Sequence, residues 1–103
     1  MIVVPASTSS LPPLVIDLRE KDIQCWEELW DELSFRCGLP RWFGRNLDAW
    51  WDTIQARNIS SLVDAHFLII RLPRAGLFGP GADGARFVDT TNESDYARVE
   101  FDG

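Results

Sequence analysis

Two carboxylates set four residues apart are the part of this sequence closest to a chemical site. Asp48 and Asp52 lie in a segment whose periodicity predicts a helix from Leu47 to about Ala56, and this spacing places both on one side of that helix. Like charges at this spacing destabilise an isolated helix by about a few tenths of a kcal/mol. No Lys or Arg between Asn46 and Ala56 compensates them. The pair either binds a cationic partner or is simply solvated, with Asp48 stabilised by the positive end of the helix dipole.

Catalysis by these groups is disfavoured. Carboxylates on an open helix side would both be solvated, and nothing in the sequence separates their pKa values as an acid–base pair requires. His66, the only histidine, begins a predicted strand and has no nearby Ser or Cys pattern for a nucleophilic triad. No set of Cys and His residues has the spacing of a metal site. The sequence therefore predicts a protein without catalytic residues, metal or cofactor.

The cysteines and the N-terminal residues predict the cellular compartment of the protein. Cys25 and Cys37 are twelve positions apart along a predicted helix, so their Cα atoms would lie roughly 18 Å apart, beyond the reach of a disulfide. Reduced thiols predict a cytoplasmic protein. The first residues have neither the basic nor the apolar region of a signal peptide, and no apolar stretch is as long as a transmembrane helix.

Length and charge narrow the kind of partner. The 103 residues suit one domain, and 46% hydrophobic with 25% charged residues is ordinary globular composition. The net charge of −6 disfavours nucleic acid as a partner, because holding phosphates needs clustered Lys and Arg. The same charge favours encounter with a basic protein surface.

The elements that must position Asp48 and Asp52 follow from the apolar pattern. A strand is predicted at 14–18, a helix with an acidic, solvated side at 26–37, and a last, half-exposed strand at 97–101. The apolar run Phe67–Ile70 predicts a strand buried on both faces in a parallel sheet covered by helices. Residues 57–65 are predicted to be a polar connection, and residues 85–94 are predicted to form either a poor helix or a strand.

This order predicts an α/β fold: a small three-stranded, mainly parallel sheet with helices packed on it. The sheet would have four strands if Ile2–Val4 adds an edge strand. Residues 1–13, rich in Ser, Thr and Pro, are expected to be a flexible lead-in to a domain at 14–103.

The second helix is expected to have two different sides. With Asn46 as its N-cap, Leu47, Trp50 and Ile54 share a core side. The outer side carries Asp48, Asp52 and Gln55, with Trp51 on the border and Trp42 and Phe43 preceding the helix. Aromatic residues beside uncompensated carboxylates are typical of a recognition surface for something cationic.

The run from Leu39 to Asp52, LPRWFGRNLDAWWD, resembles the signature of the barstar-like ribonuclease inhibitors. In that signature Leu-Pro, two aromatic positions and Gly lead into Asn-Leu-Asp-Ala-x-Trp-Asp. The resemblance covers roughly residues 14–72 and implies a barstar-like fold of three parallel strands with packed helices. It also implies a cytoplasmic inhibitor that binds one to one in the basic active site of a secreted microbial ribonuclease of the guanyl type, with no membrane or nucleic-acid partner.

The resemblance assigns roles residue by residue. Asp52 matches the aspartate that enters the nuclease's phosphate-binding catalytic pocket, Asp48 a second interfacial aspartate, and Trp51 the tryptophan between them. Trp42 takes the place of an aromatic residue, usually tyrosine, that packs on the catalytic histidine of the nuclease. The other implied contact positions are Phe43, Gly44, Asn46, Leu47, Ala49 and Gln55. A further carboxylate from the family's penultimate helix would fall at or near Thr91, with Glu93 close by, and Arg45 replaces a residue that is often acidic.

Two alternatives stay open. The same fold could be an acidic interaction or immunity module that neutralises another basic toxin or protein. An enzyme that uses Asp48 and Asp52 as its acid–base pair is much less favoured.

Overall fold

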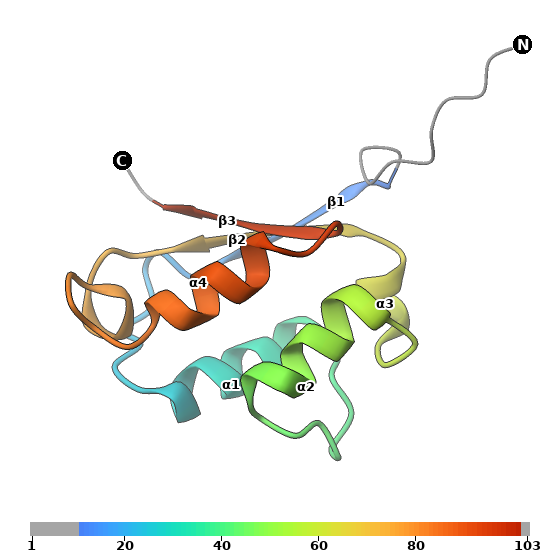
Figure 1. The fold of residues 1–103 in the computed structure, drawn as a ribbon, viewed down its shortest axis with the longest axis horizontal. Coiled ribbons are helices and arrows are strands. Elements are labelled where there is room, and N and C mark those ends of the chain that lie inside the picture. The colour runs from blue at the N-terminus through green and yellow to red at the C-terminus, as the bar shows by residue number, and fades with distance from the viewer. Residues whose placement is uncertain (1–10, 102–103) are drawn as a thin grey trace, which may run out of the picture.

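The structure, a computed structural model, describes residues 11–101. Three parallel strands, β1 (Pro13–Asp17), β2 (Phe67–Leu72) and β3 (Ala97–Phe101), form one sheet in the order β1-β2-β3. The helices lie on one face of it (Figure 1): α1 (Trp26–Arg36), α2 (Leu47–Trp51), α3 (Ser61–Asp64) and α4 (Ala85–Asn92). A π-helical turn η2 (Asp52–Ala56) continues α2, and a 3₁₀ turn η3 (Gly76–Phe78) precedes α4. The predicted α/β architecture is confirmed.

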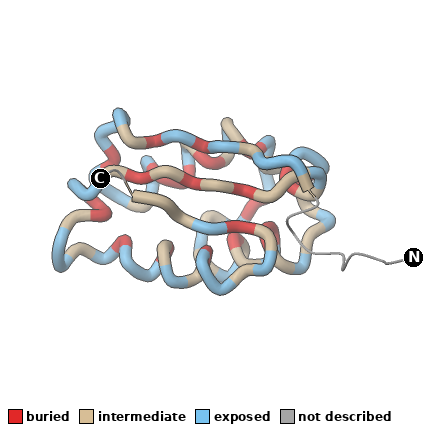
Figure 2. Tube along the Cα trace, turned by 90° about the horizontal axis from the view of Figure 1, so that it is seen from above, coloured by how far each residue is buried: buried red, intermediate tan, exposed pale blue. Residues whose placement is uncertain are grey.

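The prediction that the central strand is buried on both faces is wrong. Along β2, Leu68, Ile70 and Leu72 are buried, whereas the residues between them are only half-buried. Figure 2, viewed from the side opposite the helices, shows this alternation. The apolar run is unbroken because Phe67 and Ile69 stay partly covered on the open face, where the guanidinium of Arg98 lies 5.7 Å from the Phe67 ring.

One segment differs in secondary structure from the expectation, and for another the structure decides between the two alternatives left open. The connection at 57–65 contains α3, whose N-cap Ser60 accepts a hydrogen bond from the Val63 amide while Val63 is buried. Residues 85–92 are a helix, because Phe87 and Thr91, four apart, are both buried on one side. β1 begins at Pro13, one residue before the predicted strand. Residues 1–10, including the Ile2–Val4 segment, lie outside the described residues.

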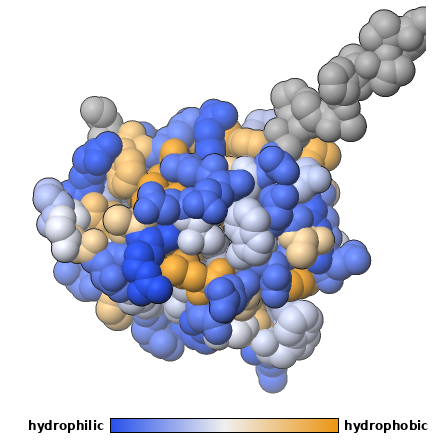
Figure 3. Space-filling model, in the orientation of Figure 1, coloured by the Kyte–Doolittle hydropathy of each residue, from blue (hydrophilic) through white to orange (hydrophobic). Residues whose placement is uncertain are grey.

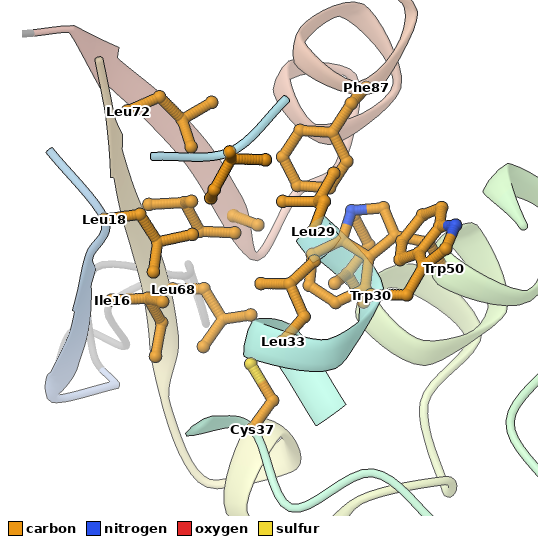
Figure 4. Packing of buried hydrophobic residues seen from close by; sticks show 14 of the residues in the cluster. Ile16, Leu18, Leu29, Trp30, Leu33, Cys37, Trp50, Leu68, Leu72 and Phe87 are labelled. Atoms are coloured by element: carbon orange, nitrogen blue, oxygen red, sulfur yellow. The ribbon is translucent and has the colours of Figure 1, made fainter. Parts of the chain in front are cut away.

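The core lies between the sheet and the helices (Figure 4). Trp30 of α1 is 3% exposed and lies at its centre, with ring centroids 5.7 Å from Phe43, 6.5 Å from Trp50 and 6.1 Å from Phe87. One indole thus joins α1, the loop before α2, α2 itself and α4. In the described part of the chain, no helix has the length and apolar character needed to span a membrane.

Both thiols are free, with Cys25 exposed and Cys37 buried at the end of α1. Burial raises the pKa of the Cys37 thiol to about 12. Just beyond it, Gly38 has a φ of 63°, a left-handed conformation that lets the chain leave the helix, and the Leu39 amide donates to the Ser34 carbonyl at 3.0 Å.

Candidate protein-binding site

The start of α2 is fixed by local hydrogen bonds. The Asn46 side chain accepts from the Ala49 amide at 2.8 Å and donates to the Gly44 carbonyl at 3.1 Å. The predicted N-cap is therefore confirmed. A Cβ on Gly44 would lie 3.1 Å from the Ala49 Cβ, so a side chain there would press on the first turn of the helix. Exposed Asn46 and Gly44 thus set where the outer side of α2 begins.

The loop before α2 divides its two aromatic residues between core and surface. Phe43 is 5% exposed and its ring packs edge-on against Trp30. The phenyl ring therefore anchors the loop in the core and leaves little surface for a partner, and the role of Phe43 in partner contact stays a prediction. Trp42 is 70% exposed, so the neighbouring indole lies on the surface beside the helix. The two adjacent side chains point in opposite directions because Phe43 is packed in the core.

Arg45 is bound to α1. Its Nη2 lies 2.8 Å from the Asp31 carboxylate and 2.9 Å from the Glu27 carboxylate, and it also donates to the Glu27 carbonyl at 3.1 Å. The hydrogen bond to Asp31 and the charge of Glu27 raise the pKa of the Arg45 guanidinium. These contacts accompany a backbone φ of 54°, which is uncommon for a residue with a side chain. The charge of Arg45, at a position that is often acidic in the family it resembles, is thus neutralised by Glu27 and Asp31 of α1.

The outer side of α2 carries Asp48 and Asp52, both exposed. The Asp52 amide bonds to the Asp48 carbonyl, so the two carboxylates lie one helical turn apart, as predicted. Neither carboxylate forms a hydrogen bond or ion pair with any residue between 11 and 101. Trp51, Leu47 and Ala49 are half-buried beside them. The result is an acidic ridge, defined as Asp48 and Asp52, with partly covered apolar side chains along its flank.

The inner side of α2 is fully packed. Trp50 and Ile54 are buried as predicted, whereas Leu47 packs on the edge of the core and is only half-buried. The Trp50 Nε1–H donates to the Thr91 hydroxyl at 2.9 Å, with both residues 0% exposed. Thr91 therefore holds α4 against α2 and has no surface with which to meet a partner, whereas Glu93 is exposed.

The end of the second helix is shaped by the turn between α4 and β3. Gln55 donates to the Asp95 carboxylate at 3.0 Å and accepts from the Ser94 hydroxyl and the Asp95 amide, each at 2.9 Å. The Arg57 amide bonds to the Asp52 carbonyl at 2.7 Å, five residues back, which gives η2 its wider turn. The Gln55 amide group is thus occupied inside the molecule, and this half-buried residue fixes the far end of the ridge.

Three of the four carboxylates of α1 are paired with cations, unlike those of the ridge, and the fourth, Glu28, accepts a hydrogen bond from the Gln24 amide at 2.7 Å. Besides the Arg45 pairs, Glu32 accepts from Arg36 at 2.9 Å and lies 3.6 Å from the Lys21 ammonium. The hydrogen bond from Arg36 and the nearby Lys21 charge lower the pKa of Glu32 below its ordinary value. A basic partner would therefore find the uncompensated negative charge on α2.

Sequence reasoning missed a pocket beside the ridge. It is lined by residues from α1, α2 and α4 and the loop before α2, namely Trp26, Trp30, Arg45, Asn46, Leu47, Asp48 and Arg86. Both tryptophans lie in the helix predicted at 26–37, where Trp30 is buried and Trp26 is only half-buried. Trp26 lies in the first turn of the helix, where the core ends, and this position could have indicated its partial exposure. Among the described residues, no group of His, Cys, Asp and Glu could hold a metal ion.

A comparison with known families decides the relationship. The model of the family described as barstar (barnase inhibitor) matches residues 13–93. The chain belongs to the barstar family. No curated protein matches it at a significant level. Because barstar-family members are inhibitors and not enzymes, membership supports a general role in inhibiting barnase-type ribonucleases.

Proposed function

We propose that this protein is a cytoplasmic, one-to-one inhibitor of a microbial guanyl-type ribonuclease, and that it acts by placing the acidic ridge in the enzyme's active site. The observation that carries the proposal is the state of the ridge: Asp48 and Asp52 are exposed and without an intramolecular partner between residues 11 and 101, in a barstar-family protein. A ribonuclease active site is basic because it binds phosphate, so it supplies the charge that the ridge lacks.

The inhibitor needs no chemistry of its own. In the bound state the Asp52 carboxylate takes the place of a substrate phosphate among the cationic groups of the nuclease, and Asp48 pairs with the basic rim one turn away. Exposed Trp42 and half-buried Trp51, which are neighbours of the pair in sequence, supply aromatic surface that excludes water in the bound state. Excluding water strengthens both charge pairs, because Coulomb energy rises as the dielectric constant falls.

Three sets of contacts within the chain support binding by the ridge without rearrangement. Asn46 caps its first turn, Trp50 and Thr91 lock its inner side, and Gln55 ties its last turn to the α4–β3 turn. Residues held in this way lose little conformational entropy on binding. The net charge of −6 adds long-range attraction to a basic enzyme and increases the rate of encounter.

Inhibition of cleavage of a dinucleotide tests the proposal. One equivalent of the protein is expected to abolish cleavage of a guanosine-containing dinucleotide by a barnase-type ribonuclease, because so small a substrate is blocked only in the catalytic pocket. The matched controls are the double variant Asp48→Ala/Asp52→Ala, expected to be inactive, and Glu28→Ala on α1, expected to inhibit fully. Inhibition of long RNA alone would place the contact away from the catalytic pocket, and no inhibition at any ratio would overturn the proposal in favour of another basic partner.

A further inference from the structure

The residue that ends the second helix has a backbone conformation that side chains rarely allow. Arg57 has a φ of 72° and a ψ of −173°, a region occupied almost only by glycine. Its amide closes the π turn on the Asp52 carbonyl at 2.7 Å, so this strained residue is bonded directly to the backbone of the ridge. Such conformations persist only where surrounding contacts hold them, and they cluster at functional sites. The side chain of Arg57 is therefore where a reason for the strain has to be found.

Contacts with Val63, His66 and Tyr96, here called the Arg57 clamp, hold this conformation. The guanidinium donates to the Val63 carbonyl at 3.1 Å and to the His66 carbonyl at 3.2 Å. It also lies 4.1 Å from the centre of the Tyr96 ring, a cation–π contact. Val63 belongs to α3, His66 directly precedes β2 and Tyr96 directly precedes β3. The clamp thus ties the end of η2 to the places where two strands enter the sheet.

Arg57 is itself covered by the protein. Its side chain is only 15% exposed, and its guanidinium lies 3.9 Å from one oxygen of the Asp64 carboxylate. The other oxygen of Asp64 accepts from the amide of Asn58, which has a positive φ of 73° as well. One network therefore holds two consecutive strained residues, and it leaves little of Arg57 for contact with a partner.

The π turn fixes the backbone on both sides of the Asp52 carboxylate. The Asp52 amide bonds back to α2, whereas its carbonyl accepts from the Arg57 amide. The next side chain, Thr53, is 0% exposed, and its hydroxyl donates to the Ala49 carbonyl at 2.8 Å, a bond that often bends a helix. Asp52 thus lies where the regular helix changes into the wider turn. A shift of that turn would move its carboxylate relative to the rest of the ridge.

The position of charged groups matters on this face of the molecule because it has little continuous apolar area. Figure 3 has the orientation of Figure 1, in which α2 lies in front of α1, and apolar residues show there only in small, separate areas among hydrophilic ones. Binding on such a surface depends on charges that meet their counterparts, and Coulomb energy falls as the distance between charges grows.

We propose that Arg57 is a positioning residue of the ridge: the Arg57 clamp holds the π turn in the form that places the Asp52 carboxylate for binding. The inference rests on the proposed function for the identity of the partner, a ribonuclease. Because Arg57 acts through Asp52, its loss matters only while the Asp52 carboxylate is present. Asp48 lies one turn earlier, in the regular α-helix, and does not depend on the clamp.

The first test uses the free protein and needs no nuclease. Arg57→Gly suits the backbone conformation while it removes the clamp, so the variant is expected to fold. The protection factor of the residue 57 amide against hydrogen exchange is expected to fall about ten-fold or more. Ile16→Val, at a buried position of β1, is the control for a change in global stability alone. An unchanged protection factor in Arg57→Gly would show that the clamp does not hold the turn and would overturn the inference.

The second test is a double-mutant cycle on the affinity for a barnase-type ribonuclease, measured by calorimetric titration. Arg57→Gly is expected to weaken binding about ten-fold in the parent protein but less than about two-fold in Asp52→Ala, because the clamp then has no carboxylate to place. In Asp48→Ala the loss is expected to stay near that in the parent. Arg57→Lys keeps a cation beside Tyr96 and is expected to recover part of the affinity.

The outcomes separate the two proposals. A loss of the same size in the parent and in Asp52→Ala would mean that Arg57 only stabilises the fold, and parent-like affinity of Arg57→Gly would mean that the clamp places nothing. Either result overturns the inference and leaves the proposed function intact. If the parent protein binds no ribonuclease, the proposed function fails, and the role of Arg57 in ribonuclease binding fails with it. The protection factor of the residue 57 amide then still shows whether the clamp holds the turn.

Discussion

The acidic sides of α1 and α2 look alike in sequence and differ in structure. On α1, Glu27 and Asp31 lie within 2.9 Å of the Arg45 guanidinium, and Glu32 accepts a hydrogen bond from Arg36. These carboxylates are neutralised by their own chain, and Glu27 and Asp31 also hold the loop before α2 on α1.

The carboxylates of α2 have no such neighbours. Asp48 and Asp52 are exposed, repel each other across one turn, and form no ion pair with any residue from 11 to 101. A helix that is destabilised by its own charges gains from a cationic partner more than a compensated helix does, because its charges are not already paired. Under the proposed function, missing compensation, and not acidity alone, is what marks the binding surface.

The largest expected effect is the loss of binding in Asp52→Ala. The variant is expected to weaken binding to the ribonuclease about 100-fold or more, because an uncompensated charge left in a buried interface costs about 3–5 kcal/mol. Asp48→Ala is expected to cost less, and Glu28→Ala on α1 less than about two-fold. Calorimetric titration measures the affinities, and thermal melts check that Asp52→Ala keeps the stability of the parent protein or gains a little from reduced repulsion.

Equal losses of affinity in Asp52→Ala and Glu28→Ala would break the comparison. They would show that the two acidic helix sides are equivalent to the partner and would remove α2 as the binding surface.

The next effect concerns stability and the inner side of the same helix. Thr91→Val leaves the buried Trp50 N–H without an acceptor, which is expected to cost about 1–3 kcal/mol of unfolding free energy. Thr91→Ser keeps the hydroxyl and serves as the control. Urea titration measures both, and the affinity of the folded protein for the ribonuclease should not change. A lower affinity of folded Thr91→Val with unchanged stability would contradict the division into a structural and a binding side.

A smaller effect is expected when α1 is made to resemble α2. Arg45→Gln removes the charge that compensates Glu27 and Asp31, so association with a basic ribonuclease should become roughly two- to five-fold faster at low salt. Stopped-flow fluorescence at several salt concentrations measures the rate. Arg74→Gln, which removes one positive charge far from the ridge, is the control, and an equal acceleration in both variants would show that only net charge matters.

The smallest effect is a pH dependence of stability. Because Arg36 and Lys21 lower the pKa of Glu32, their stabilising contribution is present above the carboxyl's ordinary value near 4.5 and is lost as the pH falls below it. Arg36→Gln is therefore expected to lower the Tm slightly at pH 7, by the equivalent of at most about 0.5 kcal/mol, and not at about pH 2.5. Arg41→Gln, at an exposed arginine, is the control. A difference that persists at low pH would mean that Arg36 stabilises α1 without Glu32.

The spacing of apolar residues predicted the helices correctly wherever one side of a helix packs on the core. The helices near 26–37 and from Leu47 were predicted because apolar residues repeat at helical spacing, and the Asn46 cap followed from its side-chain chemistry. The pattern did not distinguish a strand covered on two faces from one covered on one face, since Phe67 and Ile69 are apolar on the open face as well.

Tertiary contacts decided which predicted site residues reach the surface. Adjacent aromatic positions cannot be assigned to core or surface by type, so only the packing of Phe43 on Trp30 separates it from exposed Trp42. Gln55 is polar and suited to an interface, yet its amide is occupied by Ser94 and Asp95, which are 39 and 40 residues away in the chain. The pocket at Trp26 likewise exists only because three helices meet there.

By itself, the sequence determined that this is an acidic α/β domain whose second helix carries an uncompensated pair of carboxylates. Like-charge spacing, the repeat of apolar residues and helix capping each involve residues only a few positions apart. They can therefore be predicted from the sequence without a structure. Only the tertiary structure decided which charges are free: Arg45 is next to the ridge in sequence, but its guanidinium reaches α1 and leaves Asp48 and Asp52 uncompensated. Ion pairing depends on distance in space, and the side chains of Arg45 and Asp31 meet across fourteen residues because the fold brings α1 beside the loop before α2.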